Sequence, residues 1–166
     1  FTVNSAGAVS LFVNDICKES IYQNSTYIFG NTTYKDRLSK NYINLDFNRK
    51  IFRSTSKKYV ESFLNFQKDI KTDLIEIHNR PNYIKQIRNK FNKKIILFFH
   101  NDPLTMQGSK TKSERIFLLN NLDKILFNSN WSKDRFFIDF KKDEILKDRI
   151  DVCFQSSSKV KVNFKN

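Results

Sequence analysis

The stretches DLIEIHNRP (Asp73–Pro81), KKIILFFHNDP (Lys93–Pro103) and DKILFNSNWSKDRFF (Asp123–Phe137) decide the fold of this chain. Each holds a short run of Ile, Leu and Phe that is too short for a buried helix and suits a strand buried on both faces. Segments of helical length separate the three runs. Strands joined through helices form right-handed βαβ units, so the sequence predicts an α/β fold: a Rossmann-like parallel sheet with helices on both faces.

Polar residues follow each predicted strand at the point where its apolar run stops. They read His-Asn-Arg at 78–80, His-Asn-Asp at 100–102 and Asn-Ser-Asn at 128–130. The carboxyl ends of parallel strands lie at one edge of the sheet, where ligands bind. The only two histidines of the chain, His78 and His100, both fall at this edge. We therefore expect the three triplets to line one crevice.

The remaining pattern predicts the elements around this sheet. Apolar residues at helical spacing predict helices over 8–19, 56–70, 83–91, 113–121 and 131–140. Further strands are expected at 1–3, 25–29, 44–47 and 151–154. The loop over 101–112 lies at the carboxyl edge and is a candidate lid. We expect one domain over 1–155, with its first strand truncated, and the start of a linker over 156–166.

The chain has 166 residues and a formal net charge of +13. An AT-rich coding sequence would produce the abundant Lys, Asn, Ile and Phe by itself. The alternative is attraction to phosphates or to an anionic membrane face. Basic residues are spread along the chain, which argues against a nucleic-acid partner. Cys17 and Cys153 lack metal-ligand spacing and are expected to be buried free thiols in the cytoplasm.

The segment Ser5, Ala6, Gly7 and Ala8 is a turn of small residues before the first predicted helix. Small residues at a helix N-terminus let backbone N–H groups approach a phosphate, and the helix dipole favours the anion. The chain has no GxGxxG or Walker pattern here. By itself, such a turn is more often plain punctuation between a strand and a helix than a phosphate site.

Four segments together resemble the N-terminal domain of GT-B glycosyltransferases, of the family 4-like group. They occur in the family's order and spacing and cover nearly the whole chain: NSAGAVSLFVNDIC (Asn4–Cys17), DLIEIHNRP, KIILFFHNDP with SERIFLL (Ser113–Leu119), and DKILFNSNWSKDRFF. The resemblance implies half of a GT-B fold, in which two Rossmann-like domains face a cleft. The first domain binds the acceptor, and the C-terminal domain, absent from this chain, binds most of the nucleotide-sugar donor.

The resemblance implies an enzyme that transfers a sugar from a nucleotide sugar to a glycan or lipid-linked acceptor. Such an enzyme would serve cell-surface polysaccharide synthesis in the cytoplasm, at the inner face of the membrane. Preorganised N–H donors can stabilise the departing nucleoside diphosphate, so no metal and no cofactor beyond the donor are expected. In this interpretation, Ser5, Ala6, Gly7 and Ala8 bind the donor phosphate, although the family's turn usually holds two glycines.

The resemblance places His100 at the donor sugar, where it would bind a sugar hydroxyl or orient the acceptor. Asp102 could act as a base towards the acceptor hydroxyl, or could form an Asx-turn ahead of Pro103. Arg80 could hold an acceptor phosphate or carboxylate through its fork, or could be a surface arginine. The other expected acceptor-binding residues are Asn79, Asn101, Ser129 and Asn130, of which the last two are also candidate helix caps.

Two other classes of function remain open at this point. A basic α/β domain that binds nucleic acid is one, but the chain lacks interleaved aromatic and basic strand patterns and a recognition-helix signature. A sugar-nucleotide epimerase half on the same scaffold is the other, and likeness of fold does not exclude it.

Overall fold

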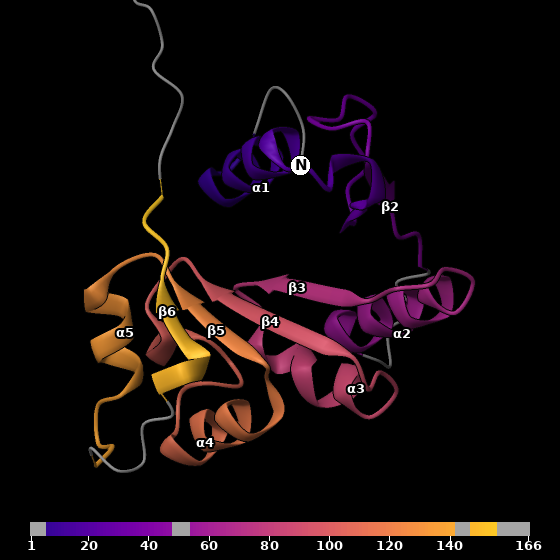
Figure 1. Ribbon diagram of the computed structural model, residues 1–166. Coiled ribbons are helices and arrows are strands. Elements are labelled where there is room, and N and C mark those ends of the chain that lie inside the picture. The colour runs from indigo at the N-terminus through magenta and orange to yellow at the C-terminus, as the bar shows by residue number, and fades with distance from the viewer. Residues whose placement is uncertain (1–5, 48–53, 142–146, 156–166) are drawn as a thin grey trace, which may run out of the picture.

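The computed structural model describes residues 6–47, 54–141 and 147–155 (Figure 1). Its main sheet has four strands, all parallel, in the order β3-β4-β5-β6. The strands are β3 (Leu74–His78), β4 (Lys94–Phe99), β5 (Lys124–Phe127) and β6 (Ile150–Val152). The expected α/β fold with a parallel sheet is therefore confirmed.

The connections between these strands are helical, as the spacing of the apolar runs predicts. The helices are α2 (Thr55–Gln67), α3 (Ile84–Arg88), α4 (Lys112–Asn121) and α5 (Asn130–Phe136), with 3-10 turns η2 (Pro81–Tyr83), η3 (Pro103–Thr105) and η5 (Lys147–Arg149). A capping box of Thr111 and Glu114 starts α4. Two predicted helices, 56–70 and 131–140, prove shorter at their carboxyl ends, and 83–91 divides into η2 and α3.

One face of the sheet forms the hydrophobic core. Side chains at alternate strand positions, such as Ile77, Leu97 and Phe127, pack against buried residues of α2, α3, α4 and α5. These core side chains are at most 8% exposed. Burial of this apolar surface is the main source of stability for the domain.

The opposite face carries the intervening positions of each strand, including Glu76, His78 and Phe98. Among the described helices, α1 (Ala8–Glu19) lies on this side, above the sheet in Figure 1. Its Phe12 ring meets the Phe98 ring edge-on, with centroids 5.2 Å apart. Helices thus lie on both faces, as predicted, with α2, α3, α4 and α5 on the core face and α1 on the other. The expectation that each strand is buried on both faces is wrong for β3, which exposes Leu74 and Glu76.

The N-terminal part forms a separate two-stranded parallel sheet from β1 (Ile28–Gly30) and β2 (Tyr42–Asn44). Strands were expected at 25–29 and 44–47, so both predictions are shifted. The first predicted strand begins later than expected because a 3-10 turn, η1 (Gln23–Ser25), includes Ser25. The Thr26 hydroxyl donates to the Tyr22 carbonyl at 2.8 Å and stabilises this turn. The expected strand at 1–3 and the linker after residue 155 lie outside the described residues.

The two cysteines occupy different environments. Cys17 lies on the buried side of α1, and burial raises the pKa of its thiol. Cys153 is exposed just after β6, the strand at one end of the sheet. The expectation that both thiols are buried is therefore wrong for Cys153, because no described strand lies beyond β6 to cover it. In the described part of the chain, no helix is long and apolar enough to cross a bilayer.

Candidate active site

The two histidines are in direct contact at the carboxyl edge of the sheet. His78 Nδ1 and His100 Nε2 lie 2.8 Å apart, and the two ring planes are inclined by 29° with centroids 5.1 Å apart. The register explains the contact: His78 pairs with Phe98, and His100 follows Phe98 by two residues on the same face. The prediction that both histidines share one edge of the sheet is confirmed.

The histidine pair belongs to a longer line of hydrogen-bonding groups, which we call the histidine network: Glu76, His78, His100 and Gln155. His78 Nε2 lies 3.1 Å from Glu76 Oε1. At the other end, the Gln155 amide nitrogen contacts His100 Nδ1. The network joins β3, the end of β4 and the segment after β6, so three separate parts of the chain meet at His100.

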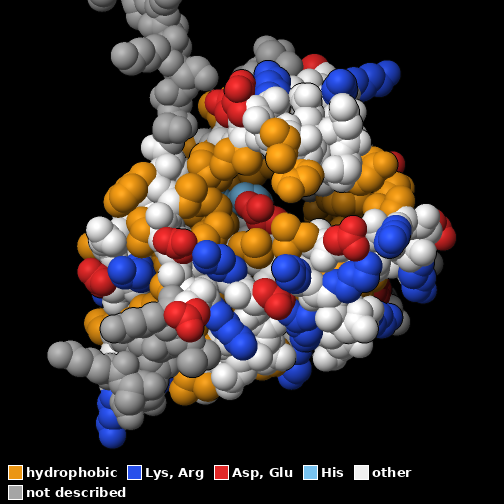
Figure 2. Space-filling model, in the orientation of Figure 1, with side chains coloured by type: hydrophobic (Ala, Val, Ile, Leu, Met, Phe, Trp, Pro, Cys, Tyr) orange, Lys and Arg blue, Asp and Glu red, His pale blue; other side chains and the backbone are white. Residues whose placement is uncertain are grey.

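Aromatic rings enclose His100, the buried member of this network. His100 is 7% exposed and stacks on Phe98 at a centroid distance of 4.2 Å, while Phe12 of α1 meets it edge-on at 5.0 Å. Figure 2 shows a histidine beside an acidic side chain at the bottom of a hollow ringed by hydrophobic side chains. The pKa of His100 is lowered from 6.5 to about 4, mainly by burial and to a lesser extent by the neighbouring His78. His100 is therefore neutral at neutral pH.

Stability is expected to fall between about pH 6.5 and pH 4 because His100 is buried in its neutral form. The unfolded chain takes up this proton near 6.5 and the folded chain near 4, so acid favours the unfolded state across that interval. Thermal unfolding followed by circular dichroism over this range should show the loss, and His100→Gln should reduce it. The Asp102 and Asp123 carboxyls have pKa values lowered from 3.8, so their protonation affects stability mainly at pH values below this interval. An unchanged pH profile in His100→Gln would contradict the assignment.

Two asparagines hold the backbone of His100 in place. Asn79 adopts φ 53°, a left-handed conformation that Asn tolerates better than most residues, and its Oδ1 accepts from the His100 N–H at 2.7 Å. Asn128 Nδ2 donates to the His100 carbonyl at 2.8 Å. Arg80 donates to the Asn79 carbonyl at 2.9 Å and is otherwise exposed. Asn79 thus has a structural role in this state, and the role of Asn128 was missed from the sequence.

Asp102 forms the Asx-turn that the sequence offered as an alternative. Its Oδ1 accepts from the Leu104 N–H at 3.0 Å, and its Oδ2 pairs with Arg135 Nη2 at 3.0 Å. Burial acts to raise the pKa of Asp102, but the bonds from Arg135 and Leu104 outweigh it and the pKa is lowered. Both oxygens accept hydrogen bonds, and the lowered pKa makes Asp102 a weaker base than an isolated carboxylate. Its use as a base stays a prediction.

The remaining predicted site residues lie at helix starts and loops. The Ser129 hydroxyl accepts from the Ser132 N–H at 3.2 Å and caps α5, and exposed Asn130 is the first residue of that helix. Asn101 is exposed after β4. Gly7 is the N-cap of α1 between Ala6 and Ala8, without a side-chain cap; Ser5 lies outside the described residues. Binding of donor or acceptor at these positions stays a prediction.

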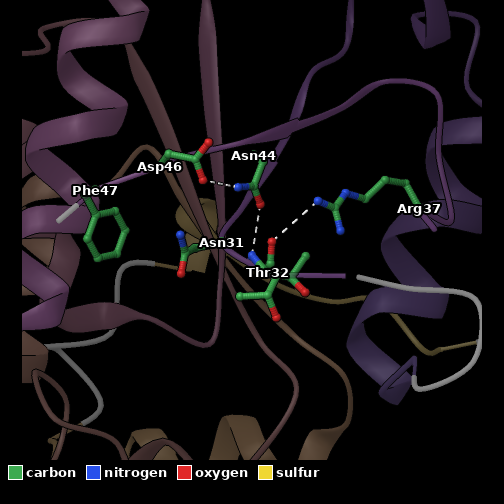
Figure 3. Close-up of a pocket in the computed structure, with 7 residues that line it drawn as sticks. Asn31, Thr32, Arg37, Asn44, Asp46 and Phe47 are labelled. Atoms are coloured by element: carbon green, nitrogen blue, oxygen red, sulfur yellow. Dashed lines mark hydrogen bonds between the residues drawn. The ribbon is translucent and has the colours of Figure 1, made fainter. Parts of the chain in front are cut away.

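A second, polar hollow of about 790 Å³ lies at the carboxyl ends of β1 and β2 (Figure 3). It is lined by Asn31, Thr32, Thr33, Arg37, Asn44, Asp46 and Phe47. Asn44 Oδ1 accepts from the Thr32 N–H at 2.9 Å, and Arg37 donates to the Thr32 carbonyl at 3.4 Å. Polar residues after two parallel strands were the signal that could have located this hollow from the sequence.

Within the described ranges, no three His, Cys, Asp or Glu side chains are grouped as metal ligands. A comparison with known protein families finds no matching family, and a search of curated proteins finds no similar sequence.

Proposed function

We propose that this chain is the acceptor-side half of a glycosyltransferase that moves a sugar from a nucleotide-sugar donor to a glycan or lipid-linked acceptor. The observation that supports this most is the position of His100, a buried neutral imidazole in a hollow at the carboxyl edge of a parallel sheet. Ligands of open α/β sheets bind at that edge. The four sequence segments that resemble the family supply the reaction class.

The groups around His100 suit a sugar more than a charged ligand. A neutral imidazole keeps one nitrogen without a proton, and this nitrogen can accept a hydrogen bond from a hydroxyl group. The rings of Phe12 and Phe98 exclude water on two sides, and this strengthens any hydrogen bond formed there. The N-terminal turn of α1, which begins four residues before Phe12, would offer free N–H groups to the leaving phosphate.

Sugar transfer is expected to require a donor-binding domain in addition to residues 1–166. The full-length protein should transfer label from a panel of radiolabelled nucleotide sugars to membrane lipid or glycan acceptors. The isolated chain should show little transfer, because the resemblance assigns most donor contacts to the second domain. The matched control is the isolated chain mixed with the same substrates at the same concentration.

Two outcomes would contradict this proposal. Robust transfer by residues 1–166 alone would refute the two-domain interpretation. No transfer from any nucleotide sugar, together with tight salt-dependent binding to RNA or DNA, would favour a nucleic-acid-binding domain instead.

A further inference from the structure

The positions of the protons in the histidine network follow from its Glu76 end. A carboxylate accepts hydrogen bonds and donates none, so His78 Nε2, 3.1 Å from Glu76, carries a proton. In neutral His78 the other nitrogen, Nδ1, is then an acceptor. It lies 2.8 Å from His100 Nε2, so that nitrogen must be the donor of this bond. His100 Nδ1 is left without a proton.

The opposite end of the network agrees with this direction. The Gln155 amide nitrogen, which can only donate, is the atom that contacts His100 Nδ1. Every bond in the network therefore has one donor and one acceptor. The direction derived from Glu76 needs no assumption about Gln155, so the two ends support each other.

We infer that Glu76 and His78 are positioning residues that hold His100 in its Nε2–H tautomer, so that Nδ1 accepts a hydrogen bond from a sugar hydroxyl in the place where the Gln155 amide now lies. The choice of a sugar as ligand depends on the proposed function, whereas the tautomer does not. His100 is the residue that touches the ligand, and Glu76 and His78 act through it.

A ligand can displace the Gln155 amide from His100 Nδ1 more easily than it can displace the other members of the network. Its side chain is exposed and follows β6, whereas Glu76 and His78 belong to β3 and are held by pairing with β4. A hydroxyl that replaces the amide donates in the same direction, so no other bond in the network changes. The Nε2 side of His100 remains occupied by His78, which leaves Nδ1 as the nitrogen available to a ligand.

The test is a two-bond proton–nitrogen correlation spectrum of the full-length protein with isotope-labelled histidine, recorded at neutral pH. His100→Gln identifies the His100 ring signals among those of the protein. The wild type should show His100 protonated at Nε2 and bare at Nδ1. Glu76→Ala should give a mixture of His100 tautomers, while Glu76→Gln, which keeps an acceptor oxygen, should retain the wild-type state. Glu19→Ala, at an exposed glutamate ending α1, is the matched control and should change nothing.

A third variant distinguishes the contribution of Gln155 from that of Glu76. Gln155→Ala should leave the His100 tautomer unchanged, because the tautomer is set from Glu76. In sugar transfer, Glu76→Ala should lower kcat roughly tenfold, the effect of losing one modest hydrogen bond, and Glu76→Gln should restore most of it.

A wild-type His100 protonated at Nδ1, or a tautomer that follows Gln155 rather than Glu76, would overturn the inference. A tautomer that depends on Glu76 in a protein that transfers no sugar would contradict the proposed function and would still support the arrangement of protons. The spectrum therefore tests the arrangement of protons, and the transfer assay tests the proposed function, independently of each other.

Discussion

Replacing Arg115 with alanine is expected to lower the free energy of unfolding by about 3 to 4 kcal/mol, because it breaks a buried cationic network. Arg115 is 1% exposed although it carries a guanidinium group. Its Nη1 donates to the Lys110 carbonyl at 2.8 Å and its Nη2 to the Ile138 carbonyl at 3.0 Å. The carboxylate of Asp139 lies further off, at 3.7 Å.

Arg115 thus ties α4 to the loop before it and to the segment after α5. The alanine variant would leave carbonyl groups without a donor and would open a cavity beside Phe140, whose ring centre lies 5.6 Å from the guanidinium carbon. Arg115→Met fills most of the volume without donating, so it should be less destabilising than alanine. The free energy of unfolding that Arg115→Met still loses measures the contribution of the hydrogen bonds.

The measurement is urea denaturation of both variants beside Lys85→Ala, which removes an exposed cation from α3. We expect the control to stay within about 0.5 kcal/mol of the wild type. A similarly small change in Arg115→Ala would show that the buried guanidinium contributes nothing net to stability.

Much of the main sheet could be predicted because three apolar runs stand out from a polar chain. The runs 95–99 and 125–127 gave their strands nearly to the residue. The second face of the sheet could not be predicted from these runs, since apolar content does not reveal which helix covers which side. Glu76 within β3 was the visible sign that this face is partly open.

The N-terminal sheet was predicted less well because side chains, rather than periodicity, set its limits. Asn41 donates to the Thr26 carbonyl at 2.9 Å, and Asn44 accepts from the Thr32 N–H at 2.9 Å. Such bonds between a side chain and a distant backbone group leave no pattern in the sequence. β1 begins three residues after its predicted start, and β2 begins two residues before its predicted start.

The candidate site was predictable where topology alone decides and not where packing decides. Parallel strands had to bring His78 and His100 to one edge, and they do. The pairing of Glu76 with His78 follows from alternation along β3 and could have been foreseen. The contact of Gln155 with His100 spans 55 residues and depends on how the chain leaves β6.

His100→Ala is expected to lower the turnover of the full-length protein on the order of a hundredfold, which corresponds to about 3 kcal/mol of lost transition-state stabilisation. His100 directly follows β4, the most buried strand, and Asn79 and Asn128 hold its backbone, so its ring is placed rigidly. His78→Ala is the matched control. It should cost less activity, because in the proposed arrangement His78 acts through His100 and does not touch the ligand.

The structure adds a condition to this experiment. His100 packs between Phe12 and Phe98, so its loss could also loosen α1. Circular dichroism and urea denaturation must show that the variant is folded under the assay conditions, and His100→Gln, which keeps more of the side chain, provides a second variant if alanine unfolds.

The central claim, that His100 takes part in sugar transfer, is tested most directly by the turnover of the folded His100 variants at saturating donor and acceptor. The claim predicts a loss on the order of a hundredfold, larger than that of His78→Ala. Near-normal turnover in a folded His100→Ala protein would contradict it and would leave His100 as a histidine that only packs between two phenylalanine rings.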